Sequence, residues 1–154
     1  MRRLSGFLLI AAILLVPALF SGGGPARAQS QALTFDGDTA ILTVAIKPDK
    51  TADFEQIMAD VRTALMKSEK PERQQQAAGW KVVKGTMPMK DGNIVYMHLI
   101  DPVVRDADYT ILAILYEANP DPAVQRAIFE KYRDAFAASL GGGAFTTAVD
   151  LSMP

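Results

Sequence analysis

Two spacings of hydrophobic side chains in the first half of the chain each predict a different element. Residues 40–47, AILTVAIK, are apolar at odd and even positions alike, which predicts a strand that is buried on both faces. Residues 51–67 carry apolar side chains three and four positions apart, which predicts an amphipathic helix. The side chains of this stripe are Phe54, Ile57, Met58, Val61 and Leu65. A Pro-Asp-Lys sequence between the two elements predicts a turn.

The middle of the chain predicts a short further helix and then a β-hairpin. Pro71 ends the first helix, and residues 72–78 can add another turn or two. The charged and Gln-rich run from Lys67 to Gln76 is otherwise expected to be a solvated connector. Residues 80–86 and 93–101 predict two strands, because an Asp-Gly turn signal lies between them.

The last third of the chain predicts one or two helices and a closing strand. Residues 108–118 fit a buried helix or a buried strand, and their length and an aspartate cap favour the helix. A second helix begins at Pro122, with Asp121 as its N-cap. The glycine run at residues 141–143 is expected to end that helix, and residues 145–151 to form the last strand.

The order of these elements predicts an α+β fold of the ferredoxin-like, split βαβ type. Such a fold has a four-stranded antiparallel sheet with helices on one face. The predicted strands are apolar on both faces, however: Tyr96 and His98 lie on one face of their strand, and Val95, Met97 and Leu99 lie on the other. Because something must bury the face without helices, we expect a homodimer in which two copies join these faces.

The N-terminal residues predict export. Two arginines precede an uncharged run at residues 4–21, and the sequence Ala-Arg-Ala follows at 26–28, which is typical of a secretory signal peptide over residues 1–28. The apolar stretch is shorter than the ~20 residues of a membrane-spanning helix. An uncleaved N-terminal anchor is the alternative.

Cleavage after residue 28 predicts three parts: the signal peptide, a flexible lead-in at 29–39, and a single domain at 40–154. The mature protein is then expected in the periplasm or outside the cell.

Charge and composition exclude several classes of function. The chain has 16 Lys and Arg residues against 17 Asp and Glu residues, and three of the arginines belong to the predicted leader, so the mature chain is acidic. An acidic surface is poorly suited to nucleic acid. The chain has no cysteine, which excludes disulfides, thiolate metal sites and lipidation at a cleavage-site cysteine. We therefore expect no metal, no nucleic acid partner and, after cleavage, no membrane partner.

The opening TVAIKPDKTADFEQIMADV and the element order over 40–151 resemble the dimeric α+β barrel superfamily, whose best-known branch is the antibiotic biosynthesis monooxygenase-like domains. The stretches KPERQQQAAGWKV and MHLIDPVVRDADYTILAILYEA are similar to a set of small exported bacterial proteins with no assigned function. The resemblance implies a barrel built from two facing sheets, with a small apolar cavity between sheet and helices in each subunit. It assigns no catalytic residue.

His98, the single histidine of the chain, is the candidate catalytic residue, because a neutral imidazole can act as a general base or bind haem near pH 7. Tyr96 shares its strand face, and Trp80 and Tyr109 fall in neighbouring elements. These four side chains are the predicted ligand-binding residues, since polar groups in an apolar layer mark a binding site. The alternative is that they pack the core and satisfy one another's hydrogen bonds.

Three functions stay open at this point. The first is an exported protein that binds a small apolar or aromatic molecule without a cofactor. The second is a cofactor-independent monooxygenase-like or haem-handling enzyme, which the resemblance implies and His98 would serve. The third is a purely structural exported protein.

Overall fold

The computed structural model describes residues 32–151, which form an α+β domain. The predicted signal peptide lies outside the described residues. The elements are β1 (Thr39–Ile46), a single 3-10 turn η1 (Pro48–Lys50), α1 (Thr51–Lys67), α2 (Pro71–Gly79), β2 (Trp80–Lys84), β3 (Ile94–Ile100), α3 (Ile111–Ala118), α4 (Pro122–Ala135) and β4 (Phe136–Phe145). The amphipathic helix predicted at 51–67 is confirmed, and Phe54, Ile57, Val61 and Leu65 form its buried face.

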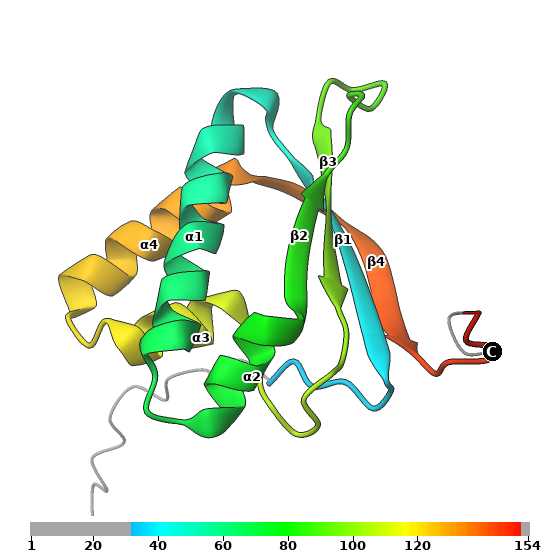
Figure 1. The fold of residues 1–154 in the computed structure, drawn as a ribbon. Coiled ribbons are helices and arrows are strands. Elements are labelled where there is room, and N and C mark those ends of the chain that lie inside the picture. The colour runs from blue at the N-terminus through cyan, green and yellow to red at the C-terminus, as the bar shows by residue number, and fades with distance from the viewer. Residues whose placement is uncertain (1–31, 152–154) are drawn as a thin grey trace, which may run out of the picture. The chain divides into compact units, whose positions relative to one another are not determined.

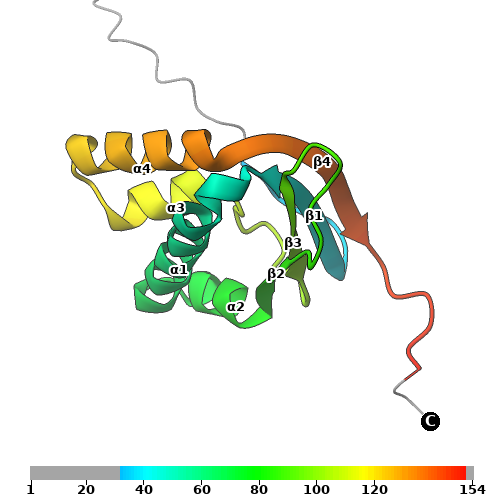
Figure 2. The ribbon, with the colours of Figure 1, turned by 90° about the horizontal axis from the view of Figure 1, so that it is seen from above.

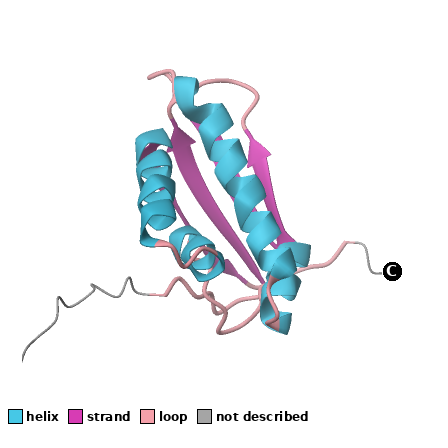
Figure 3. Ribbon diagram, turned by 90° about the vertical axis from the view of Figure 1, so that its left-hand side faces the viewer, coloured by secondary structure: helices cyan, strands magenta, loops and turns pink. Residues whose placement is uncertain are grey.

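The four strands form one open antiparallel sheet in the order β2-β3-β1-β4. All four helices lie against the same face of this sheet (Figures 1 and 2). In Figure 3 they stand in front of the strands, and the long helix α1 runs alongside the strand direction. β3 separates β1 from β2, and β1 separates β3 from β4, as the split βαβ plan requires. The prediction of an α+β fold with a four-stranded antiparallel sheet is therefore confirmed.

Strand register decides which side chains face the helices. Leu42 of β1 and Val82 of β2 both lie opposite His98, and Val44 lies opposite Tyr96. These positions belong to the covered face, where α1 contributes Phe54 to the same core. Because side chains alternate along a strand, the odd-numbered positions of β1 and β3 lie on the other face.

That other face, called the open face below, has no helix over it (Figure 2). It is largely apolar: by register, its side chains are Thr39, Ile41, Thr43, Ala45, Lys81, Val83, Val95, Met97, Leu99, Ala138 and Phe145. Among these, only Lys81, on the edge strand β2, carries a charge. Val83 and Phe145 are 43% and 51% exposed. The structure thus shows the two-sided apolar strands that the sequence predicts.

The end of the chain differs from the prediction. Helix α4 does begin after Asp121, whose carboxylate accepts a hydrogen bond from the Ala123 amide at 2.8 Å. It ends at Ala135, however, and the glycine run lies inside β4 instead of ending the helix. The predicted strand at 145–151 is wrong, because β4 has already paired with β1 through residue 145.

The run at 108–118 is helical only from residue 111, and the aspartate before it does not cap the helix. The Asp108 carboxylate accepts hydrogen bonds from the amides of Leu33 and Thr110, both at 2.9 Å. Leu33 in turn accepts a bond from the Tyr109 amide at 2.8 Å, and Phe35 is buried. Residues within the predicted lead-in are thereby tied to the loop before α3.

No helix among the described residues is both long enough and apolar enough to cross a membrane.

Candidate functional site

The structure brings the four predicted site residues into one aromatic layer beneath the helices. Trp80 begins β2, and His98 lies on β3 across from Val82, two positions further along β2. This register lets the Trp80 indole N–H donate a hydrogen bond to His98 Nδ1 at 3.1 Å. The Tyr109 ring lies 5.4 Å from the Trp80 ring, edge to face, which joins the loop before α3 to the sheet.

The hydrogen bond from Trp80 fixes the state of the imidazole. An indole nitrogen only donates, so Nδ1 of His98 is unprotonated and the proton of the neutral ring lies on Nε2. Burial lowers the pKa of His98 to about 4, because the charged ring would lose its hydration. His98 is only 2% exposed. At neutral pH it is therefore an uncharged core side chain with one nitrogen already engaged.

The hydroxyl of Tyr96 bonds to helix α1 and has no hydrogen bond with His98 among those of the described residues. It donates a hydrogen bond to Glu55 Oε1. Lys84 donates to the same oxygen at 2.9 Å. The bond from Tyr96, followed by that from Lys84, lowers the pKa of Glu55, while burial is the main cause that raises the pKa of Tyr96. This group holds α1 against the edge strand β2.

Tyr109 is similarly occupied. Its hydroxyl accepts a hydrogen bond from the Val104 amide at 2.9 Å, and its ring packs against Phe35 with 5.3 Å between centroids. The four predicted residues therefore pack against their neighbours in the aromatic layer beneath the helices. The hollow between the helices that is described below is lined by none of them, nor are two smaller hollows near Arg105 and near Met66. Their role as ligand-binding residues stays a prediction.

The surroundings of His98 do not fit a haem group. The Trp80 ring lies 5.7 Å from the imidazole on one side, and the Phe54 ring lies 6.1 Å away at right angles. A porphyrin on the imidazole would have to displace the partly buried ring of Trp80 and the buried ring of Phe54. Among the described residues, no group of three His, Asp or Glu side chains is arranged to hold a metal ion.

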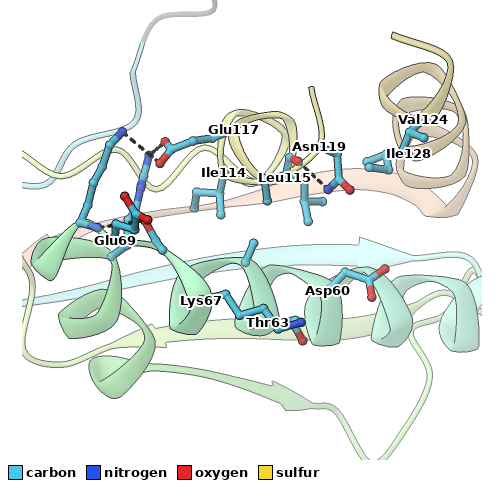
Figure 4. A pocket seen from close by; sticks show the side chains of 15 residues that line it. Asp60, Thr63, Lys67, Glu69, Ile114, Leu115, Glu117, Asn119, Val124 and Ile128 are labelled. Atoms are coloured by element: carbon cyan, nitrogen blue, oxygen red, sulfur yellow. Dashed lines mark hydrogen bonds and ion pairs between the residues drawn. The ribbon is translucent and has the colours of Figure 1, made fainter. Parts of the chain in front are cut away.

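A hollow lies elsewhere, between α1, α3, α4 and the start of α2. This helix groove is half open and has a volume of about 750 Å³. That volume is within the range of small-molecule sites, roughly 300–1,000 Å³. Its apolar lining consists of Ala64, Ile114, Leu115, Ala118, Val124 and Ile128. Figure 4 shows Val124 and Ile128 at one end of the groove and Glu117 at the other.

The Glu117 end of the groove is polar and tightly held. Arg73, at 9% exposure, donates to the Asp108 carbonyl at 2.7 Å, to Gln76 Oε1 at 2.9 Å and to Glu117 Oε2 at 2.9 Å. Lys70 pairs with the other oxygen of Glu117 at 3.0 Å. Burial alone would raise the pKa of Glu117, but hydrogen bonds from Lys70 and Arg73 outweigh burial and lower it.

Sequence reasoning missed this end of the groove. The run from Lys67 to Gln76 was expected to be a solvated connector, but Arg73 and Gln76 are buried on the inner face of α2. The signal in the sequence is their spacing: Arg73 and Gln76 are three positions apart, so a helix turns both side chains to one side. Because Arg73 and Gln76 are polar, the apolar periodicity that usually indicates a buried helix face is absent here.

The remaining lining residues belong mainly to α1 and the turn after it. Asp60, Thr63 and Lys67 lie along α1, and Glu69 follows near Lys70 (Figure 4). The groove thus combines an apolar wall from α3 and α4 with a charged rim. Comparisons of the chain with protein-family models, with curated proteins and with solved structures gave no match.

Proposed function

We propose that this protein binds a small apolar or aromatic molecule in the helix groove and does so as a homodimer. The observation that carries the proposal is the groove itself, where exposed Ala118 and Val124 and half-buried Ile128 form an apolar wall beside a charged rim. Val124 is 41% exposed there. A ligand that covers this wall would gain about 25 cal/mol for each Å² of apolar surface removed from water.

Binding is tested with a neutral fluorescent apolar probe, N-phenyl-1-naphthylamine, added to the mature chain. Replacing Ala118, an exposed groove residue, by Trp should fill the groove and weaken probe binding about tenfold. Ala127→Trp is the matched control, because this alanine is exposed on α4 but does not line the groove. Equal probe affinity in both variants and in the wild type would remove the groove as the site.

The dimer is proposed from the open face. Four strands about 4.8 Å apart and roughly seven residues long, at ~3.3 Å per residue, present a plane of roughly 400 Å². This area is comparable to the largest apolar patch of a typical monomer, roughly 300–600 Å², and such patches are often interaction sites. A second copy is the occupant we infer, because a face with a single lysine at its edge matches itself without opposing like charges at its centre.

Analytical ultracentrifugation of the mature chain at micromolar concentration tests the dimer. Leu99→Asp should give a monomer or an unfolded chain, because a buried unpaired carboxylate costs several kcal/mol. Phe129→Asp should leave the dimer intact, because Phe129 is 42% exposed on α4, away from the open face. A folded wild-type monomer at that concentration would refute the dimer.

The alternative, a monooxygenase-like or haem-handling enzyme, requires His98 or its neighbours to reach a substrate or cofactor. The packing around His98 favours the binding function instead, because Trp80 occupies Nδ1 and the ring is buried. Purified protein that absorbs in the Soret region, with the absorbance lost in His98→Gln, would favour the enzyme.

We also propose that the protein is exported to the periplasm or secreted. The order of basic, apolar and small residues over 1–28 supports this location.

A further inference from the structure

We infer that the molecule bound in the helix groove carries a carboxylate, and that Glu117 occupies the place this carboxylate takes when the molecule binds. The inference rests on the proposed function, because it adds the chemistry of the polar end to a ligand whose apolar part lies on α3 and α4. The inferred ligand is an apolar or aromatic carboxylic acid. The probes below distinguish an aliphatic acid from an aromatic one.

Hydrogen bonds hold the Arg73 guanidinium in a fixed position at this end of the groove. Two of its contacts, to the Asp108 carbonyl and to Gln76, come from buried or part-buried groups and hold the side chain in place. The third contact points to Glu117 at the groove. A guanidinium that is already oriented can receive a planar carboxylate at little cost in conformational entropy.

Two cations converge on the Glu117 carboxylate, Lys70 on one oxygen and Arg73 on the other. Glu69 also lines this end of the groove, and the Asp108 carboxylate acts on Arg73 from outside the groove. Asp60 lines the groove nearer the middle of α1 and accepts a hydrogen bond from Gln56 (Figure 4). If Glu117 moves away, Lys70 and Arg73 lose their shared anion and would attract another carboxylate to the same place.

The position of Glu117 lets its carboxylate be replaced by that of a ligand. It lies in the last turn of α3, where the helix dipole disfavours a negative charge. Its side chain is 35% exposed, and apart from Lys70 and Arg73 it has no hydrogen-bond partner among the described residues. The carboxylate can therefore swing into solvent when another anion takes its place, without leaving a buried group unpaired.

The test compares three naphthalene probes that share one ring system: 2-naphthoate, neutral 2-naphthol and cationic 2-naphthylmethylamine. Calorimetric titration of the wild-type mature chain should show 2-naphthoate binding about tenfold more tightly than 2-naphthol, and the amine most weakly. Octanoate and benzoate, titrated in parallel, distinguish an aliphatic from an aromatic acid.

Two variants change the charge at the polar end of the groove, and a third is the control. Glu117→Gln removes the competing carboxylate and should tighten 2-naphthoate binding about tenfold, with 2-naphthol affinity unchanged. Lys70→Gln should reduce the preference for 2-naphthoate over 2-naphthol. Glu130→Gln, an exposed glutamate of α4 that does not line the groove, is the matched control and should behave as the wild type. Unchanged 2-naphthol binding also shows that each variant keeps a folded groove.

The outcomes separate the two proposals. If 2-naphthol or the amine binds as tightly as 2-naphthoate, the carboxylate inference is wrong and binding of an apolar molecule stands. If Glu117→Gln weakens 2-naphthoate binding, Glu117 helps to hold the ligand and is not its stand-in, which also overturns the inference. If none of the probes binds, the proposed function fails together with the inference.

Discussion

At the scale of single residues, burial and one hydrogen bond set the chemistry of His98. The hydrogen bond from Trp80 needs an unprotonated Nδ1, and the apolar surroundings exclude the water that a charged ring requires. Both effects favour the neutral ring in the folded state. The histidine therefore links the stability of the fold to pH.

The free energy of unfolding should fall as the pH drops through the acid side of neutrality. The pKa of His98 is lowered from 6.5 to about 4 in the folded chain, so its contribution is present above pH 6.5 and is lost as the pH falls toward 4. Linkage gives a loss of roughly 2 kcal/mol between about pH 7 and pH 5. Urea denaturation at these two pH values measures it.

His98→Gln is the comparison, because glutamine supplies an acceptor for Trp80 but does not titrate. This variant should lose most of the pH dependence in that window. A variant as pH-dependent as the wild type would mean that other groups carry the effect.

The strand face of His98 could be predicted, because alternation places it beside Tyr96 without any knowledge of pairing. Its hydrogen bond with Trp80 could not. That contact depends on the register of β2 against β3, which a single sequence does not define.

At the scale of elements, tertiary pairing overrides local preference in β4. The glycine run is a strong helix-ending signal, but here it lets the backbone of β4 approach β1. A Cβ on Gly142 would lie 2.1 Å from the Ile41 carbonyl oxygen and 2.8 Å from the Leu42 Cα. Gly141 has a φ of 99°, where the register between β4 and β1 shifts.

Gly142→Ala should therefore destabilise the fold by about 1–3 kcal/mol, because the new methyl group meets the backbone of β1. For a chain of this size the melting temperature should fall by roughly 4 °C per kcal/mol. Thermal denaturation followed by circular dichroism measures the change.

The neighbouring residue gives a matched control. A Cβ on Gly143 meets nothing within 4 Å, so Gly143→Ala should change stability by no more than about 0.5 kcal/mol. Equal effects at the two positions would contradict the close approach of β4 to β1.

A helix can be predicted from the sequence when its apolar side chains recur at helical spacing over its whole length. The helix at 51–67 was predictable because its apolar stripe continues over the whole element. Helix α2 was predicted only as an option, because its buried face carries Arg73 and Gln76 in place of apolar side chains. The loop before α3 was not predicted, since Asp108 bonds to a segment 75 residues away.

At the scale of the whole molecule, element order was sufficient to predict the sheet and its helical cover. The split βαβ plan leaves few arrangements, and the apolar open face follows from the strands' own alternation. The helix groove was not predictable. Its shape depends on how α3 and α4 pack beside α1, which no spacing within a single helix specifies.

The proposed export predicts a defined N-terminus for the mature chain. If residues 1–28 are removed, Edman sequencing or mass spectrometry of protein recovered from the periplasm or medium should find Gln29 first. Protein that retains Met1 and stays in the membrane fraction would show an uncleaved anchor instead.

NMR can locate the bound molecule and so decide whether the helix groove is the binding site. The ¹⁵N-labelled mature chain is titrated with neutral 2-naphthol while its amide shifts are followed. Binding in the groove should give shifts that cluster at groove residues such as Ala64, Leu115 and Ile128. Shifts that cluster instead at Trp80 and His98, or that follow Val95 and Leu99 on the open face, would contradict it.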